Sequence, residues 1–153
     1  MNETVGPRVF SIEEANGLVP ELAKRVAEQL ELGGTIQRLI AELNERTPPA
    51  GGRHADMVDI TQRSEDSQEL RRLKHHVGEL VRRYREGWLF VEELGAVIKD
   101  PRDGLLDFYG RIDDRIVWLC WRHGETRIEH FHELDQGFSE RKPLAPVRGR
   151  MLN

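Results

Sequence analysis

Apolar residues in the first third of the chain recur every three or four positions, which is the period of one face of an α-helix. The pattern begins just after Ser11 and Glu14, which have the S-x-x-E spacing of a capping box at a helix start, and runs to Leu43. We therefore predict a first helix over residues 11–46. It should be kinked near Pro20, because proline lacks the amide hydrogen that a helix interior uses.

A second helical pattern follows a polar stretch rich in proline and glycine, residues 47–63, which we expect to be a loop. From Leu70 to Ile98 the apolar positions follow the heptad spacing that is typical of a coiled coil. Ser64 precedes this pattern and can cap the helix. The sequence therefore predicts a second helix over residues 64–99.

The two helical stretches are similar in length, which favours a long antiparallel hairpin. We interpret Gly33 and Gly34 as positions of close packing against a partner helix, in preference to a hinge. Further apolar residues lie beside the main seam and widen the apolar stripe: Leu18, Leu32, Leu39, Val81 and Leu89. Because one hairpin covers only part of such a stripe, we expect a homodimer built as a four-helix arrangement.

The hydrophobic period changes from helical to alternating after Asp100 and Pro101. Residues 104–135 hold three stretches rich in β-branched and aromatic residues, and we expect them to form a three-stranded β-meander. The predicted turns are Asp113-Asp114 and His123-Gly124-Glu125. Residues 141–153 contain two prolines and a glycine and should form an irregular tail.

These elements predict an α+β protein, a long antiparallel helical hairpin followed by a small three-stranded antiparallel sheet. A length of 153 residues fits one domain spanning 1–153. The single cysteine excludes an intrachain disulfide and fits a reducing compartment. The chain shows neither a secretory signal pattern nor an apolar run of about 18 residues, so we expect a cytoplasmic protein without a membrane partner.

Residues that could carry chemistry gather in the predicted meander: Asp107, Cys120, His123, Glu125, His130, His132, Glu133 and Asp135. A two-residue turn at Asp113-Asp114 would place Asp107 opposite Cys120 on one face of the sheet. A three-residue loop would place His130 and His132 beside Trp118 and Ile116 on that same face, whereas a loop of even length would place them on the other. We favour the three-residue loop, because Gly124 suits its left-handed position.

Thiolate, imidazole and carboxylate groups together can bind a divalent metal such as zinc, which makes Cys120, His130, His132 and Asp107 the candidate ligands. No C-x-x-C or H-E-x-x-H motif supports this site. The favoured interpretation is that Cys120 is a small buried hydrophobic residue and that the histidines are half-exposed and hydrogen-bonded to neighbouring carboxylates. A cysteine–histidine nucleophile is the weakest of the three, because no third group or oxyanion hole is evident.

A run of basic residues along the second helix is a candidate RNA-binding face: Arg71, Arg72, Lys74, His75, His76, Arg82, Arg83 and Arg85. Acidic residues are interleaved at pairing distances, as in Glu79 and Arg83, which favours a solvated outer face instead. The formal net charge of −4 also gives no general attraction to nucleic acid, so we do not expect a nucleic-acid partner.

Two stretches of the chain resemble a bacterial family catalogued as domain of unknown function 2203. They are FSIEEANGLVPEL and KDPRDGLLDFYGRIDDRIVWLCWRHGETRIEHFHELDQGFSERKPL. The second is the more specific, since GLLDF, LCWRHGE and FHELDQGFSER follow the family's order and spacing. Phe131 departs from it by standing where the family more often has tryptophan. The resemblance implies the same hairpin and sheet but transfers no reaction, substrate or cofactor.

Taken together, these patterns favour a dimeric interaction or scaffold module over an enzyme. The first alternative is a divalent-metal-binding protein with its Cys/His/carboxylate site on the meander. The second is an RNA-binding protein that uses the basic face of the helix predicted over 64–99.

Overall fold

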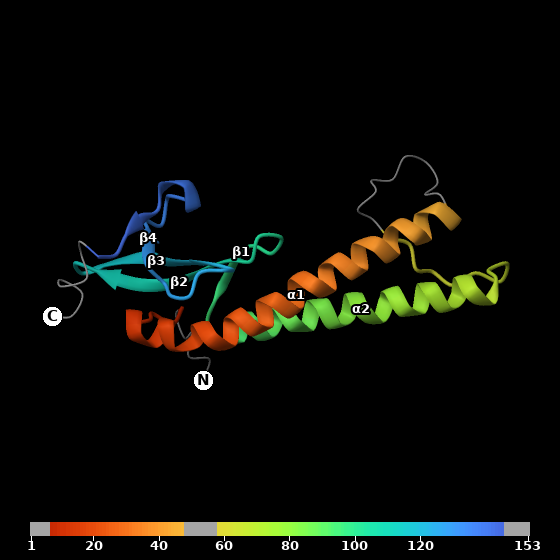
Figure 1. Ribbon diagram of the computed structural model, residues 1–153, viewed down its shortest axis with the longest axis horizontal. Coiled ribbons are helices and arrows are strands. Elements are labelled where there is room, and N and C mark those ends of the chain that lie inside the picture. The colour runs from red at the N-terminus through yellow and green to blue at the C-terminus, as the bar shows by residue number, and fades with distance from the viewer. Residues whose placement is uncertain (1–6, 48–57, 146–153) are drawn as a thin grey trace, which may run out of the picture. The chain divides into compact units, whose positions relative to one another are not determined.

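The computed structural model describes residues 7–47 and 58–145, and it is an α+β structure (Figure 1). The chain divides into two compact units. Residues 28–89 form the first, here called the helical unit, and residues 1–27 and 90–153 form the second, the sheet unit. Neither of the helices in the described parts is long and apolar enough to cross a membrane.

The first helix, α1 (Ile12–Arg46), begins at the predicted capping box. The amide of Glu14 donates to Ser11 Oγ at 3.1 Å, and the amide of Ser11 donates to Glu14 Oε1 at 3.2 Å. Each side chain thus satisfies an amide that has no partner within the helix. α1 continues for 35 residues without interruption, and Pro20 lies exposed within it.

The second helix, α2 (Gln68–Glu93), starts later than the predicted residue 64. Its cap is Ser67, whose Oγ accepts a hydrogen bond from the Leu70 amide at 3.1 Å, rather than Ser64. The residues just before it are held by a buried ion pair between Lys74 Nζ and Asp66 Oδ2 at 2.7 Å. The described part of the predicted 47–63 loop is residues 58–63; residues 48–57 lie outside the described part.

The predicted second helix is also wrong at its C-terminal end, because α2 stops at Glu93 instead of residue 99. Gly95 has a φ of 110°, a conformation that ends a helix and that glycine adopts without steric cost. The chain then enters β1 (Val97–Asp100), so that strand structure begins before Asp100. Ile98 fits the heptad spacing of the predicted helix, but it lies in β1 and pairs with Leu106 of the sheet.

Within the helical unit, α1 and α2 pack antiparallel. The Gln29 side-chain amide near one end donates to the Tyr84 carbonyl at 2.7 Å, and Arg46 lies 3.4 Å from Glu69 at the other end. One cluster of four buried apolar residues lies between the helices: Ile36, Ile40, Val77 and Leu80. A Cβ on Gly33 would lie 3.3 Å from the Tyr84 ring, which confirms the predicted close packing there. A Cβ on Gly34 would meet nothing within 4 Å, so that glycine is not explained by packing.

The sheet has five antiparallel strands in the order β1-β2-β3-β4-β5, not the predicted three. After β1 they are β2 (Leu105–Ile112), β3 (Arg115–Arg122), β4 (His130–His132) and β5 (Lys142–Pro143). The extra strands come from residues assigned to the second helix and to the irregular tail. Proline in β5 is compatible with an edge strand, where one side needs no amide donors. A short 3-10 helix, η1 (Phe138–Glu140), precedes β5.

Different segments of the chain cover the two faces of the sheet. On one face Phe108 packs edge-on against Phe10, with ring centroids 5.1 Å apart, just before α1 begins. On the other face Arg141, after η1, reaches Cys120 of β3 at 4.0 Å. Figure 1 shows the start of α1 on one side of the sheet and the segment after β4 on the other. Both faces are therefore covered, and side chains between the sheet and the C-terminal segment are shielded from water.

The glycines of the helical unit provide a test of this packing. We expect Gly34→Ala to stabilise the protein by about 0.5–1 kcal/mol, because a helical alanine loses less conformational entropy and meets no neighbour. Gly87→Ala should instead destabilise it by about 0.5–1.5 kcal/mol, since its Cβ would lie 2.0 Å from the buried Gln29 Oε1 and would displace the Gln29 amide from its hydrogen bond with the Tyr84 carbonyl. Urea unfolding of both variants measures the difference. Equal effects would contradict the described packing of α1 on α2.

Candidate metal centre

The β2–β3 hairpin sets the register of the candidate site. Asp113 and Asp114 have φ values of 49° and 65°, the left-handed conformation at both positions that a tight two-residue hairpin turn requires. The resulting ladder pairs Ile112 with Arg115 and, further along, Asp107 with Cys120. The predicted opposition of Asp107 and Cys120 on one face is therefore confirmed.

The connection from β3 to β4 is longer than the predicted three residues. Gly124 does adopt the expected positive φ, 102°, and the Trp121 indole donates to the Glu125 carbonyl at 2.9 Å. The next residues leave the ladder, because the Ile128 amide bonds to Asn16 Oδ1 of α1 at 2.7 Å. Pairing resumes only at residue 130.

The longer connection changes the pairing of the histidines but not their face. The structure pairs His130 with Cys120 and His132 with Trp118, whereas the three-residue loop predicted Trp118 and Ile116 as their partners. The predicted register is thus wrong by two residues. A shift of two preserves the side of the sheet, so both histidines lie on the Cys120 face as expected.

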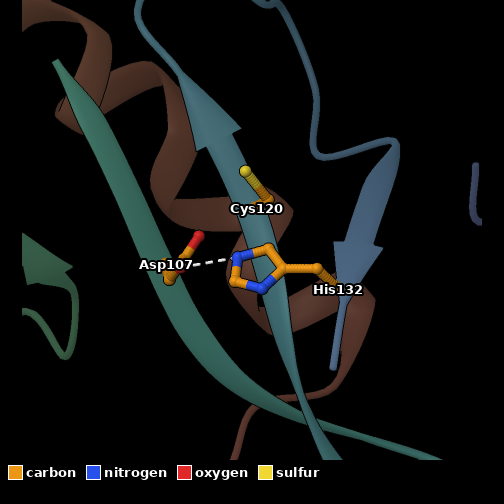
Figure 2. Close-up of side chains that lie close together, drawn as sticks. All are labelled: Asp107, Cys120 and His132. Atoms are coloured by element: carbon orange, nitrogen blue, oxygen red, sulfur yellow. Dashed lines mark hydrogen bonds and ion pairs between the residues drawn. The ribbon is translucent and has the colours of Figure 1, made fainter. Parts of the chain in front are cut away.

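Three of the four predicted ligands converge. One potential ligand atom from each of Asp107, Cys120 and His132 lies within 4.8 Å of the other two. The three side chains come from three adjacent strands, β2, β3 and β4, and lie close together, with Asp107 and His132 joined by a hydrogen bond (Figure 2). Their residues are 1%, 0% and 2% exposed, so the cluster is sealed from water.

His132 is held by hydrogen bonds at both ring nitrogens. Nδ1 lies 3.0 Å from the Glu133 carbonyl oxygen, and because a carbonyl only accepts, Nδ1 carries a proton. Nε2 lies 2.8 Å from Asp107 Oδ2 and is the nitrogen that faces the cluster. Glu133 is fixed in turn by Arg115 of β3, whose Nε is 3.0 Å from Oε1. This arrangement, with the outer nitrogen anchored to a carbonyl, is common for histidines that bind metals.

Asp107 is a buried carboxyl group with spare bonding capacity. Burial raises its pKa, an effect that the attraction of His132 opposes. Its Oδ2 meets His132, while its Oδ1 is buried and has no hydrogen-bond partner among the described residues. An unsatisfied carboxyl oxygen in a protein interior is costly, so this atom is a candidate ligand for a cation.

Cys120 is not suited to act as a nucleophile. Burial raises the pKa of its thiol to about 12, and the neighbouring Asp107 carboxylate adds to the effect. Both nitrogens of His132 are already engaged, so this ring is not placed to accept the thiol proton. On the far side, Arg141 lies 4.0 Å from Cys120 Sγ and 3.1 Å from Glu125 Oε1.

The fourth predicted ligand, His130, lies beside the cluster but outside it. It is directly opposite Cys120, and its side chain is 29% exposed. Its Nδ1 is buried without a hydrogen-bond partner in the described part of the chain, 3.9 Å from Glu125 Oε2. Of the remaining candidates, Glu133 contributes its carbonyl, while Asp135 is exposed.

Sequence reasoning missed the residues that brace the cluster. Arg141 belongs to the stretch predicted as an irregular tail, and no spacing in the sequence marks it as a neighbour of Cys120. Arg115 and Glu133 are 18 residues apart. The two residues meet only because of the register between β3 and β4. That register could not be read from the sequence, because the length of the connection between these strands was not known.

Three of the eight residues of the basic run on α2 make contacts within the described structure. Arg82 is paired with both Glu79 and Glu86, at 2.9 and 2.8 Å. Arg71 donates to backbone carbonyls before the helix, and Lys74 is buried against Asp66. These contacts give Arg71, Lys74 and Arg82 a structural role, and Glu79 pairs with Arg82 rather than with the Arg83 considered from the sequence.

Comparison with known proteins gives one match. The family model described as "Uncharacterized conserved protein (DUF2203)" matches residues 8–144. No curated protein and no solved structure matches the chain. The match spans the cluster and every described strand, and its description states no activity.

The raised pKa of Cys120 predicts a pH dependence of stability in the metal-free protein. The folded state favours the neutral form of the thiol. The resulting contribution to the free energy of unfolding is therefore complete below the usual thiol pKa of 9.0 and is lost as the pH rises toward about 12. Relative to Cys120→Ala, the wild-type protein should lose up to about 1.4 kcal/mol per pH unit across this window. Denaturant unfolding at pH 8 to 11 (about one-unit steps) tests this; parallel curves for the two proteins would contradict the buried thiol.

Proposed function

Because this chain belongs to the DUF2203 family, whose description assigns no activity, we propose from its own geometry that it binds one divalent transition-metal ion. The observation that carries the proposal is the convergence of Asp107, Cys120 and His132 within 4.8 Å in a sealed interior. Groups of this kind are rarely buried together unless they are paired or coordinate a metal.

The donor set favours zinc. Sulfur, imidazole nitrogen and carboxylate oxygen are its three usual protein ligands, with bonds of about 2.0–2.3 Å. Four ligands at these distances in a tetrahedron lie about 3.3–3.8 Å from one another. The three groups, now within 4.8 Å of one another, would have to draw together to that spacing, and a metal between Asp107 and His132 would replace their direct 2.8 Å hydrogen bond.

The charges of the cluster also suit a divalent ion. A thiolate and a carboxylate carry two negative charges, which one divalent ion balances while the imidazole remains neutral. The adjacent Arg141–Glu125 pair is itself neutral and adds no net charge to the interior. The bound ion would relieve the unsatisfied Asp107 Oδ1 and allow Cys120 to deprotonate despite its burial.

A structural role fits this position better than a catalytic one. The three side chains are almost fully shielded, and a catalytic ion needs a route by which substrate can reach an open coordination position. The ligands come from β2, β3 and β4, of which β4 has only three residues. A shared ion would therefore fasten this short strand to the hairpin.

Cobalt titration tests the proposal. Metal-free protein should bind one Co²⁺ per chain with a sulfur-to-metal charge-transfer band, and Cys120→Ala should abolish that band. His132→Ala should weaken binding, while His76→Ala, on an exposed helical residue, should bind as wild type. Zinc at a hundred times its dissociation constant should stabilise the wild-type protein by about 2.7 kcal/mol in chemical unfolding. Folded wild-type protein that binds neither metal would contradict the proposal.

As a second candidate function we propose the expected homodimer, through the helical unit. The specific observation is the apolar surface that the helices leave beside their core: Leu32, Leu39 and Val81 are only half-buried and Leu89 is 56% exposed. A second copy of the unit would cover these side chains in a four-helix arrangement. An interaction or scaffold role would follow from such an assembly.

Sedimentation equilibrium at micromolar concentration tests this second candidate. The wild-type protein should be a dimer, and Leu89→Glu should shift it toward monomer because a carboxylate is costly to bury in an apolar interface. Leu134→Glu is the matched control, since Leu134 is similarly exposed, at 49%, but belongs to the sheet unit. A monomeric wild-type protein would remove the basis of this proposal.

A further inference from the structure

We infer that His130 is the fourth protein ligand and closes the coordination shell, so that the ion has no water ligand. This inference rests on the proposed metal function. It goes further by specifying as a ligand the histidine that lies beside the cluster, and it assigns the site to the closed, structural class of zinc centres.

The strand pairing places His130 within reach. His130 and Cys120 are directly opposed in the antiparallel β3–β4 ladder, where paired Cβ atoms lie about 4.5–5.5 Å apart on one face of the sheet. Asp107 is opposed to the same cysteine from the other side, on β2. Cys120 thus lies at the centre of a row of three potential ligands across three strands, with His132 two residues further along β4.

The bonding of His130 leaves it free to turn. Its Nδ1 is a buried polar atom without a hydrogen-bond partner in the described part of the chain, which is an unfavourable state for an imidazole. The nearby Glu125 carboxylate, at 3.9 Å, is beyond hydrogen-bonding distance. Rotation of the ring that turns Nε2 toward Cys120 therefore breaks no hydrogen bond within the described residues and leaves Nδ1 on the side of Glu125.

Glu125 is positioned to orient His130 after such a turn. Its Oε1 is fixed by the Arg122 amide at 2.7 Å and by Arg141 at 3.1 Å, which leaves Oε2 on the side of His130. A carboxylate that receives the second ring N–H of a metal-bound histidine is a common supporting contact. Glu125 would thus orient the ring of His130, just as the Glu133 carbonyl orients the ring of His132.

X-ray absorption spectroscopy of the zinc-loaded, full-length protein tests the inference directly. The expected first shell is one sulfur, two imidazole nitrogens and one oxygen. His130→Ala should retain one imidazole and bind zinc at least about tenfold more weakly in a competition assay with a chromophoric chelator. His76→Ala is the control for loss of a histidine elsewhere. His130 makes no hydrogen bond within the described structure and is partly exposed, so the variant should fold.

The outcomes separate this inference from the function on which it rests. Two imidazoles in the wild-type protein and one in His130→Ala would support a closed site. A single imidazole in the wild type, with zinc affinity unchanged in His130→Ala, would overturn the role of His130 and leave a three-ligand centre. Wild-type protein that binds no zinc would overturn the metal function itself, and this inference with it.

Discussion

The turn at Asp113 and Asp114 is the constraint on which the candidate centre depends. Two consecutive residues with positive φ form the type of turn that joins antiparallel strands by a two-residue loop, and this loop sets the pairs along β2 and β3. A slip of one residue would move Asp107 to the face covered by Phe10 and leave Cys120 without its carboxyl neighbour. The local backbone conformation of two aspartates therefore determines the chemistry available six residues away along the strand.

The polar cluster lies in an interior where its presence needs an explanation. A buried carboxyl, thiol and imidazole are expensive to desolvate, and an apolar trio of similar volume would often be as stable or more so. The surrounding contacts do not minimise that cost, since one oxygen of Asp107 has no partner among the described residues. They do orient the ring of His132, through Glu133 and Arg115. Fixed geometry with unused bonding capacity is better suited to a bound cation than to packing alone.

The parts of the structure that sequence could predict are those governed by local rules. The α1 cap, the alternation of the strands and the tight turn each depend on residues close together, and the opposition of Asp107 and Cys120 followed from them. The end of α2 could not be inferred from period alone, because Ile98 fits both a heptad and a strand while Gly95 decides between them. Ile128 and Arg141 make contacts with residues far away in the sequence. The register of β4 and the residues that cover the cluster therefore could not be predicted from local patterns.

Native mass spectrometry of protein purified without an affinity tag tests the central claim most directly. The account predicts a folded species that carries one zinc ion per chain and has lost the protons that zinc replaces, and that reverts to the bare chain mass after chelation. A folded protein of bare chain mass, unchanged after incubation with zinc, would contradict the claim that Asp107, Cys120 and His132 form a metal centre.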